Sequence, residues 1–276
     1  MPLRLIINAD DYGRSPDISR GIRDAHLRGI VTSSTCMMNM PSVAEDIKIA
    51  LKETPNLGLG VHLVLTAGRP VLSPEKLPTL TNNQGGFLKL EALIGNAKNI
   101  NTAEVRAEWR AQIEAFFAAS GKKPTHLDSH HHSSYFTPAN LQTMLELANE
   151  YGVAIRLPLA HANDATISGL PDELAAEMLE FSPRILDRLQ PRSPDAFFAT
   201  FYDENATRAE FMRILGDMLP NGTFEIMCHP GYVDEAFAKE SGYAYLRQEE
   251  LAILTDPAMR KEVEKRGIQL ISFAPL

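Results

Sequence analysis

The sequence predicts an α/β protein that folds as a distorted (β/α) barrel, similar to a TIM barrel, with seven or eight mostly parallel strands. Short apolar and β-branched runs alternate with amphipathic stretches, so most strands are followed by a helix; such connections are right-handed crossovers that produce a parallel sheet. The length of 276 residues suits one large domain. No repeat or linker divides the chain, so we expect residues 1–276 to form a single domain.

The first half of the chain sets up this alternation. The first strand is expected at Leu3–Asn8, an apolar run rich in leucine and isoleucine. A helix follows because Ser15 is a good N-cap, Pro16 suits the first helical position and Gly29 can end the segment. The next expected elements are a strand at Ile30–Met38, a helix at Ser42–Lys52, a strand at Leu57–Leu65, a long loop at Gly68–Gly86, a helix at Thr102–Ala119 and a strand at Pro124–Ser129.

The second half continues the pattern with one irregular stretch. Pro138–Tyr151 is expected to form a helix that Gly152 ends, and a strand at Val153–Leu157 is stopped by Pro158. Residues 159–195 are less regular, with helical spacing only at Pro171–Leu189. The remaining expected elements are a strand at Asp195–Phe201, a helix at Arg208–Met218, a strand at Thr223–Cys228, helices at Glu249–Leu254 and Pro257–Arg266, and a strand at Ile268–Phe273.

Composition excludes several classes of partner. The chain has 27 basic and 35 acidic residues, a net charge of −8, which disfavours nucleic acid because binding it needs a basic face. Two cysteines, Cys36 and Cys228, imply no disulfide framework. The sequence shows no signal peptide and no apolar run near the roughly 20 residues of a spanning helix, so we expect no membrane partner and a cytoplasmic location.

Two adjacent carboxylates, Asp10 and Asp11, leave the first buried strand. Their repulsion requires a cation or a proton between them, and where a strand ends the backbone can turn so that both reach one cavity. One could then bind a metal while the other acts as a base. A capped helix start or a solvated turn explains the pair about equally well.

Histidines lie within one further expected strand and at the end of another. His62 lies within an otherwise apolar strand, where a satisfied core histidine is the simpler explanation. The segment Thr125–His132 is more informative, because alternation along a strand would place His126, Asp128, His130 and His132 on one side if the strand continues that far. This run directly after a buried-type strand favours a functional role over a surface cluster.

The candidate residues all fall at the carboxyl ends of expected strands, the edge of a barrel where chemistry gathers. Arg156 and His229 lie at such ends too; Arg156 could hold a carboxylate or a substrate oxygen, or form only a structural salt bridge. One aspartate and two histidines leave coordination positions open for water and substrate. Together with a carboxylate base and a histidine acid, these groups are the equipment for hydrolysing an amide or ester.

Four segments together resemble the YdjC-like carbohydrate deacetylases of ChbG and HpnK type, which are related to NodB-type polysaccharide deacetylases. They are Ile6–Gly13, Gly60–Thr66, Pro124–His132 and Met227–Tyr232, in the family's order and at similar spacing. The resemblance implies a distorted barrel and removal of an N-acetyl group from an amino sugar. Residues 66–100, 159–195 and Ser133–Tyr135 depart from the chitooligosaccharide members, which leaves the sugar open.

The resemblance also implies roles for individual residues. Asp11, His62 and His130 would hold the metal, Asp10 would be the general base, His229 the general acid, and Arg156 would orient the base or the substrate. Magnesium is the family's metal, although this ligand set is soft enough for zinc or another transition metal. The resemblance suggests a homodimer. Two alternatives stay open: another metal-dependent barrel chemistry on sugars, such as isomerisation or phosphoester hydrolysis, and a sugar-binding protein without turnover.

Overall fold

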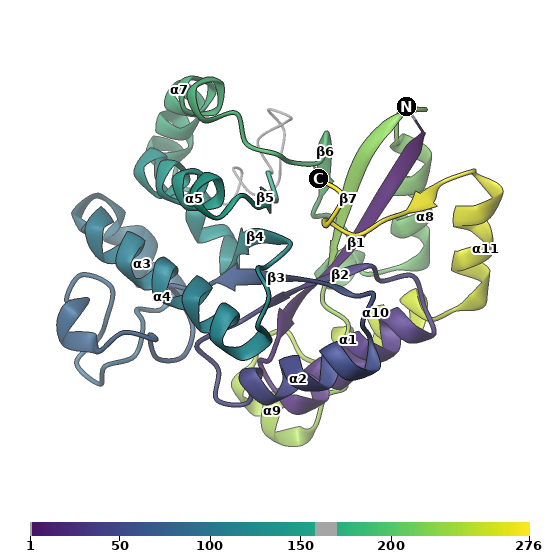
Figure 1. Cartoon of the computed structure of the whole chain (residues 1–276), viewed down its shortest axis with the longest axis horizontal. Coiled ribbons are helices and arrows are strands. Elements are labelled where there is room, and N and C mark those ends of the chain that lie inside the picture. Colours follow the sequence, from purple (N-terminus) through teal and green to yellow (C-terminus); the bar gives the residue numbers. More distant parts are fainter. Residues whose placement is uncertain (1, 158–169) are drawn as a thin grey trace.

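The computed structural model describes residues 2–157 and 170–276, and one curled parallel sheet organises them (Figure 1). Its strands follow the order β5-β4-β3-β2-β1-β7-β6, and β8 also pairs with β1. Their bounds are β1 Leu3–Tyr12, β2 Ser33–Cys36, β3 Gly58–Leu63, β4 His126–Ser129, β5 Ala154–Ile155, β6 Ala196–Phe198, β7 Gly222–Cys228 and β8 Gln269–Leu270. Every pairing is parallel. The predicted fold class, a distorted α/β barrel, is confirmed.

Helices connect the strands and lie around the outside of the curled sheet (Figure 1). Their bounds are α1 Pro16–Leu27, α2 Val43–Glu53, α3 Leu90–Gly95, α4 Thr102–Ser120, α5 Pro138–Tyr151, α7 Asp172–Leu189, α8 Arg208–Asp217, α9 Glu235–Glu240, α10 Leu246–Leu254 and α11 Pro257–Lys265. Across the two described ranges, none of the helices is both long enough and apolar enough to cross a bilayer.

The barrel is open between β5 and β6, because no strand pairing joins these two within residues 2–157 and 170–276. The outer edge of β5 is still partly covered, since the Ile155 N–H donates to the Arg192 carbonyl at 2.9 Å. Arg156, the next residue after β5, therefore emerges beside the opening and is completely buried.

The expected loop at Gly68–Gly86 contains a short 3₁₀ turn, Pro74–Lys76, and is tied to helix α4. The buried carboxylate of Glu108 accepts the backbone N–H groups of Val71 and Leu72 at 2.8 and 3.0 Å. On the same helix, Trp109 and Ile113 are fully buried. The loop is thus held against the barrel beside the carboxyl end of β3.

Several predicted boundaries were wrong in ways that matter for function. Strand β1 runs to Tyr12, so Asp10 and Asp11 lie inside it and do not follow it. Strand β4 ends at Ser129, so strand alternation does not extend to the later histidines. Helix α10 begins at Leu246, three residues before the expected start, and α3 and α9 were not predicted. Helix α7 matches the predicted helical spacing, while residues 158–169 of the irregular stretch lie outside the described residues.

Candidate active site

The carboxyl ends of the strands open onto a cavity of about 1030 Å³. Among its lining residues are Asp10, Asp11, His62, His130 and His229, which come from β1, β3 and the turns after β4 and β7. Its volume is at the upper end of the range for small-molecule sites. The structure therefore brings the five predicted residues together, and Arg156 lies beneath them in contact with Asp10.

An irregularity in β1 lets two adjacent carboxylates share this cavity. Neighbouring residues of a regular strand point to opposite faces, but the register of β1 against β2 shifts between Ala9 and Tyr12. Within that bulge Asp11 takes a left-handed conformation with φ of 71°. Aspartate tolerates this conformation better than most residues because its short side chain can bond locally. The bulge is the local reason that both Asp10 and Asp11 reach the site.

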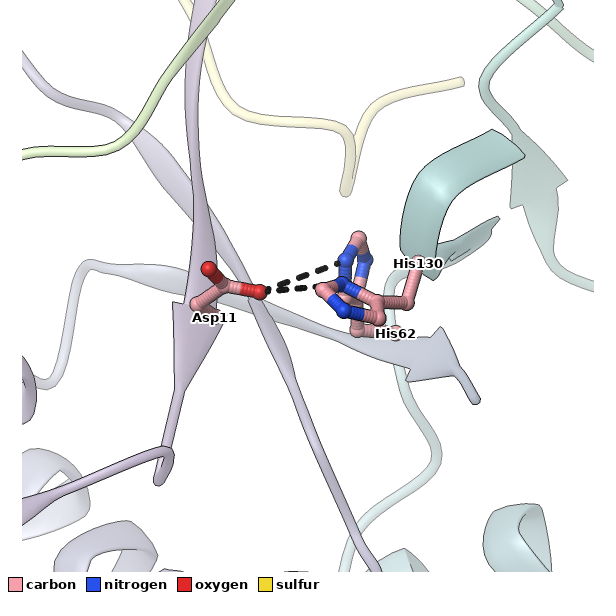
Figure 2. A group of neighbouring side chains, drawn as sticks. All are labelled: Asp11, His62 and His130. Atoms are coloured by element: carbon pink, nitrogen blue, oxygen red, sulfur yellow. Dashed lines mark ion pairs between the residues drawn. The ribbon is translucent and has the colours of Figure 1, made fainter. Parts of the chain in front are cut away.

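Asp11, His62 and His130 form a group with the geometry of metal ligands. Figure 2 shows the Asp11 carboxylate pointing at both imidazoles, with Oδ1 3.6 Å from His62 Nε2 and 3.4 Å from His130 Nδ1. Ligand atoms about 2.1 Å from one ion lie about 3.0–3.4 Å apart. Oδ1 is buried and accepts no hydrogen bond from any part of the chain that the structure describes. This orphaned oxygen between two ring nitrogens fits a divalent cation.

Asp128 fixes the orientation of His62. Its Oδ1 lies 2.6 Å from His62 Nδ1, which turns Nε2 toward Asp11. Thr35 Oγ1 donates to Asp128 Oδ2 at 3.0 Å and so holds that carboxylate in place. Burial alone would lower the pKa of His62, but Asp128 outweighs it and raises the pKa to about 9. A carboxylate behind a ligating histidine is a recurrent feature of metal sites.

Arg156 is the cation beneath Asp10. It donates from Nη1 and Nη2 to the two oxygens of Asp10, both at 2.7 Å, and from Nε to Glu225 at 2.8 Å. Its Nη1 also lies 2.9 Å from Asp128. Burial by itself would raise the pKa of Asp10, but Arg156 outweighs it and holds the pKa well below the usual range. Arg156 therefore positions an ionised carboxylate.

A second arginine, Arg247 at the start of α10, was missed in the sequence. Its Nη2 donates to Asp11 Oδ2 at 2.5 Å, and its Nε donates to the Tyr243 carbonyl at 3.0 Å. Burial opposes ionisation of Asp11, yet Arg247 holds the pKa of that carboxyl well below its usual value. Arg247 lies in a helix and not at a strand end, so no sequence signal pointed to it. Glu225 was also missed, although a charged residue within the apolar strand β7 was a readable signal.

His229 follows β7 and faces Asp10, with Nε2 3.9 Å from Oδ2. Its backbone N–H donates to Glu250 on α10 at 2.5 Å, and its ring centroid lies 5.1 Å from that of Tyr202 and 5.7 Å from that of Tyr243. Burial lowers the pKa of His229 to about 4, so the imidazole is neutral near pH 7.

Of the histidine run, only His130 belongs to the ligand group. His126 points into the core, where it lies 3.1 Å from the Asn8 side chain and stacks on Phe273 with ring centroids 3.8 Å apart. A Cβ at Gly60 would come within 2.6 Å of the His126 ring, so only glycine fits there. His132, with φ of 55°, lines the cavity but is not one of the three ligand candidates. The shared side expected for His126, Asp128, His130 and His132 required a strand that continues to His132; because β4 ends at Ser129, strand alternation covers only His126 and Asp128.

The chain belongs to the YdjC-like protein family, whose model matches residues 4–265. Curated relatives agree over nearly the whole chain. It is 37% identical over 274 residues to a carbohydrate deacetylase of Geobacillus stearothermophilus, covering 99% of this chain and 98% of the relative. It is 35% identical over 272 residues to a chitooligosaccharide deacetylase of Yersinia enterocolitica, covering 98% of each.

Solved structures agree with the fold. A crystal structure from Enterococcus faecalis V583, described as a candidate cellobiose-phosphate cleavage protein, superposes with a TM-score of 0.84 and is 32% identical, covering 100% of this chain and 99% of that one. An uncharacterised protein from Agrobacterium tumefaciens C58 shares the fold with a TM-score of 0.58 at 15% identity, covering 99% of this chain and 89% of that one. The family expected from four short motifs is therefore confirmed by the whole chain.

Proposed function

We propose that this protein is a divalent-metal-dependent hydrolase that removes an N-acetyl group from an amino sugar or a chitooligosaccharide-like oligosaccharide. The observation that carries the proposal is the orphaned Asp11 Oδ1 between His62 Nε2 and His130 Nδ1, beside a separate carboxylate, Asp10. The names of the relatives, carbohydrate and chitooligosaccharide deacetylases at 35–37% identity, support acetylated sugars as the substrate class.

Asp11, His62 and His130 would hold the metal ion. When bound, a divalent ion supplies Lewis acidity, which lowers the pKa of water and polarises an acyl carbonyl. The remaining work falls to the chain's own residues. Asp128 keeps His62 Nε2 turned toward the ligand group, and Arg247 occupies Asp11 Oδ2, which leaves Oδ1 as the free donor.

Asp10 is proposed as the general base that takes the proton of the attacking water. Its ion pair with Arg156 keeps it ionised but makes it a weak base, so it holds the proton only briefly. His229 lies 3.9 Å away and is neutral at rest, so it can receive that proton and deliver it to the leaving amine nitrogen. Catalytic hydrogen bonds are often longer without substrate than during the reaction. Both groups are weaker bases than an amine, so the proton can pass from Asp10 through His229 to the leaving amine nitrogen.

Two arguments about the identity of the metal point to different ions. The family resemblance points to magnesium, whereas two imidazoles and one carboxylate are a softer set than magnesium usually takes. We propose a single divalent site and expect zinc, cobalt or manganese to support turnover at least as well as magnesium. Metal-stripped protein reloaded with each ion in turn, with acetate release as the readout, distinguishes these cases.

The test of the function is acetate release from N-acetylated mono- and disaccharides in the presence of added metals. We expect release from at least one acetylated amino sugar and its loss with a chelator. Absence of release across a broad panel of sugars and metals would contradict the proposal. Phosphate esters in the same panel test the alternative, phosphoester hydrolysis. A second ion close to the first would favour that alternative, yet the other potential ligand group among the described residues, Asp10, His62 and Asp128, is already engaged by Arg156 and hydrogen bonds.

We also propose a cytoplasmic location and a homodimer. Cys36 and Cys228 are both buried and unpaired, which suits a reducing compartment. Cell fractionation and light scattering test the two proposals. No nucleic-acid partner is proposed, because the acidic chain of net charge −8 offers no general attraction to a polyanion.

A further inference from the structure

One wall of the cavity includes a partly exposed aromatic side chain. Tyr202 lines the cavity and is 38% exposed, an unusual state for a large ring beside a buried catalytic cluster. Its ring centroid lies 4.4 Å from that of Tyr243, tilted by 32°, and 5.1 Å from that of His229. Tyr243 and His229 therefore support the ring from within the protein, while part of it stays accessible.

The segment that carries Tyr202 is built to hold it there. The preceding residue, Phe201, is completely buried and packs edge-on against Phe211 of α8, with ring centroids 5.4 Å apart. The following residue, Asp203, has a left-handed φ of 55°, and its N–H donates to the Tyr243 hydroxyl at 3.3 Å. An anchored residue on one side and a sparsely populated backbone conformation on the other indicate a preorganised position.

The position of this ring relative to His229 identifies what it can contact. In an N-acetyl amino sugar the amide nitrogen is bonded directly to a carbon of the pyranose ring. If His229 delivers a proton to that nitrogen, the sugar ring must lie beside the imidazole. A pyranose presents C–H groups on its ring faces, and the π-face of an aromatic side chain is an apolar, electron-rich surface suited to them. Aromatic linings with a few placed polar groups are typical of small-molecule sites.

We propose that Tyr202 is a specificity-determining residue whose exposed ring stacks on the sugar ring that carries the acetamido group. This inference rests on the proposed function and deepens it, because it selects pyranose-borne acetamides over acyclic ones. The hydroxyl has no part in the proposal; the ring is the binding element.

The test compares Tyr202→Ala and Tyr202→Phe, with Tyr245→Ala as a matched control. Tyr245 is 63% exposed and is not among the residues that line the cavity. Steady-state kinetics use the metal-loaded enzyme and N,N′-diacetylchitobiose. We expect Tyr202→Ala to raise KM about tenfold with kcat within about twofold, the size of one aromatic contact, and Tyr202→Phe to stay within about twofold of the parent.

A second measurement does not depend on turnover. Calorimetric titration of the metal-loaded protein with chitobiose, the deacetylated disaccharide, reports sugar binding directly. We expect Tyr202→Ala to weaken this binding about tenfold while Tyr202→Phe and Tyr245→Ala preserve it. If no acetylated sugar is turned over but this pattern of binding appears, the deacetylase proposal fails, while the proposal that the Tyr202 ring binds a sugar stands.

Different results would contradict the proposal that the Tyr202 ring binds the sugar. A fall in kcat with KM unchanged and a shifted pH profile in Tyr202→Ala would mean that the ring acts only through His229. Equal affinity of all three variants for chitobiose would remove Tyr202 from the sugar site, as would failure of the parent protein to bind the disaccharide.

Discussion

Arg156 holds both oxygens of Asp10 in a fork, with Nη1 to Oδ2 and Nη2 to Oδ1 each at 2.7 Å. The same guanidinium reaches Asp128 and Glu225, so one arginine beside the open edge of the barrel contacts carboxyl groups of β1, β4 and β7. The ion network that sets the charge of the proposed base also joins strands that are not neighbours along the chain.

Replacing Arg156 should therefore cost stability as well as activity. Arg156→Ala leaves the buried Asp10 and Asp128 carboxylates without their cation and Glu225 without its hydrogen-bond donor, and removing one partner of a buried ion pair costs about 3–5 kcal/mol. Arg156→Lys keeps the charge but cannot form the fork, so we expect a smaller loss. Urea unfolding measures both. Arg213→Ala is the control: it removes surface ion pairs with Glu210 and Asp217 on α8 and a hydrogen bond to Thr200, and should be close to neutral. Equal losses in the two alanine variants would refute the network's role.

Asp10→Asn should separate the proposed base from the metal ligands. Asparagine keeps one acceptor for Arg156 but cannot take a proton, so we expect acetate release to fall by about 10²–10⁴-fold. Metal content, measured by inductively coupled plasma mass spectrometry, should stay at the parent level because Asp10 is not in the ligand group. Full turnover in this variant would remove Asp10 as the base.

His62→Ala and His130→Ala should each lose the metal. Each change deletes one of the three proposed protein ligands, which leaves only two of them for the ion. Metal stoichiometry after dialysis is the measurement, and His26→Ala, a histidine of α1 away from the cavity, is the control. If both variants retain one equivalent of metal, the assignment of the ligands is wrong.

Asp128→Asn tests the orientation of His62. The amide has nearly the shape of the carboxylate but no charge, so it can still contact His62 Nδ1 while no longer holding the ring by charge. Substitutions behind ligating histidines typically lower metal affinity or activity by about 10–100-fold. Competition titration with a chromogenic chelator gives the dissociation constant. An unchanged constant together with unchanged turnover would leave Asp128 with a purely structural role.

Glu225 should make stability depend on pH. Burial raises the pKa of its carboxyl to about 8, above the ordinary value of 4.5, although Arg156 opposes the shift. Below about pH 4.5 both the folded and the unfolded chain hold the Glu225 proton, so the contribution of this group to stability is fully present. Above that pH the unfolded chain releases the proton while the folded chain retains it. The contribution is therefore lost as the pH rises through about 8, where the folded chain also releases the proton.

The corresponding measurement is the free energy of unfolding across that pH window. One such group contributes a decline of up to about 1.4 kcal/mol per pH unit. Glu225→Gln cannot ionise and should flatten the decline, whereas Glu45→Gln, an exposed residue of α2, should not. Parallel profiles for the parent and Glu225→Gln would show that Glu225 is ionised in the folded protein.

The sequence was sufficient for the fold class because parallel strands leave long apolar runs and their helices leave clear caps, such as Ser15 with Pro16. Strand ends converge in a barrel, which predicted that the candidate residues meet, but the choice of Asp11, His62 and His130 as ligands came from the family resemblance; the structure places these three side chains close together. The sequence could not show the bulge that brings Asp10 and Asp11 to one side, which depends on pairing with β2. The role of Arg247 could not be predicted from the sequence, because this residue lies 236 positions from Asp11 and meets it only when helix α10 packs against the barrel.

The histidine run shows the limit of periodicity. The two-residue alternation of a strand would place His126 and His130 on the same side. The strand ends between them, however, and the two rings have different surroundings. Only the three-dimensional structure separates a histidine stacked on Phe273 from one that faces Asp11.

The contact between Gly60 and the His126 ring has an evolutionary consequence. Any side chain at position 60 would collide with that ring and push strand β3, with His62 two residues on, away from β4. The backbone carbonyl oxygen of His126 would also lie only 2.7 Å from that Cβ, so a smaller residue at 126 would not make room for alanine at 60. Position 60 must therefore stay glycine in any descendant of this protein that keeps β3 paired with β4 and His62 in place.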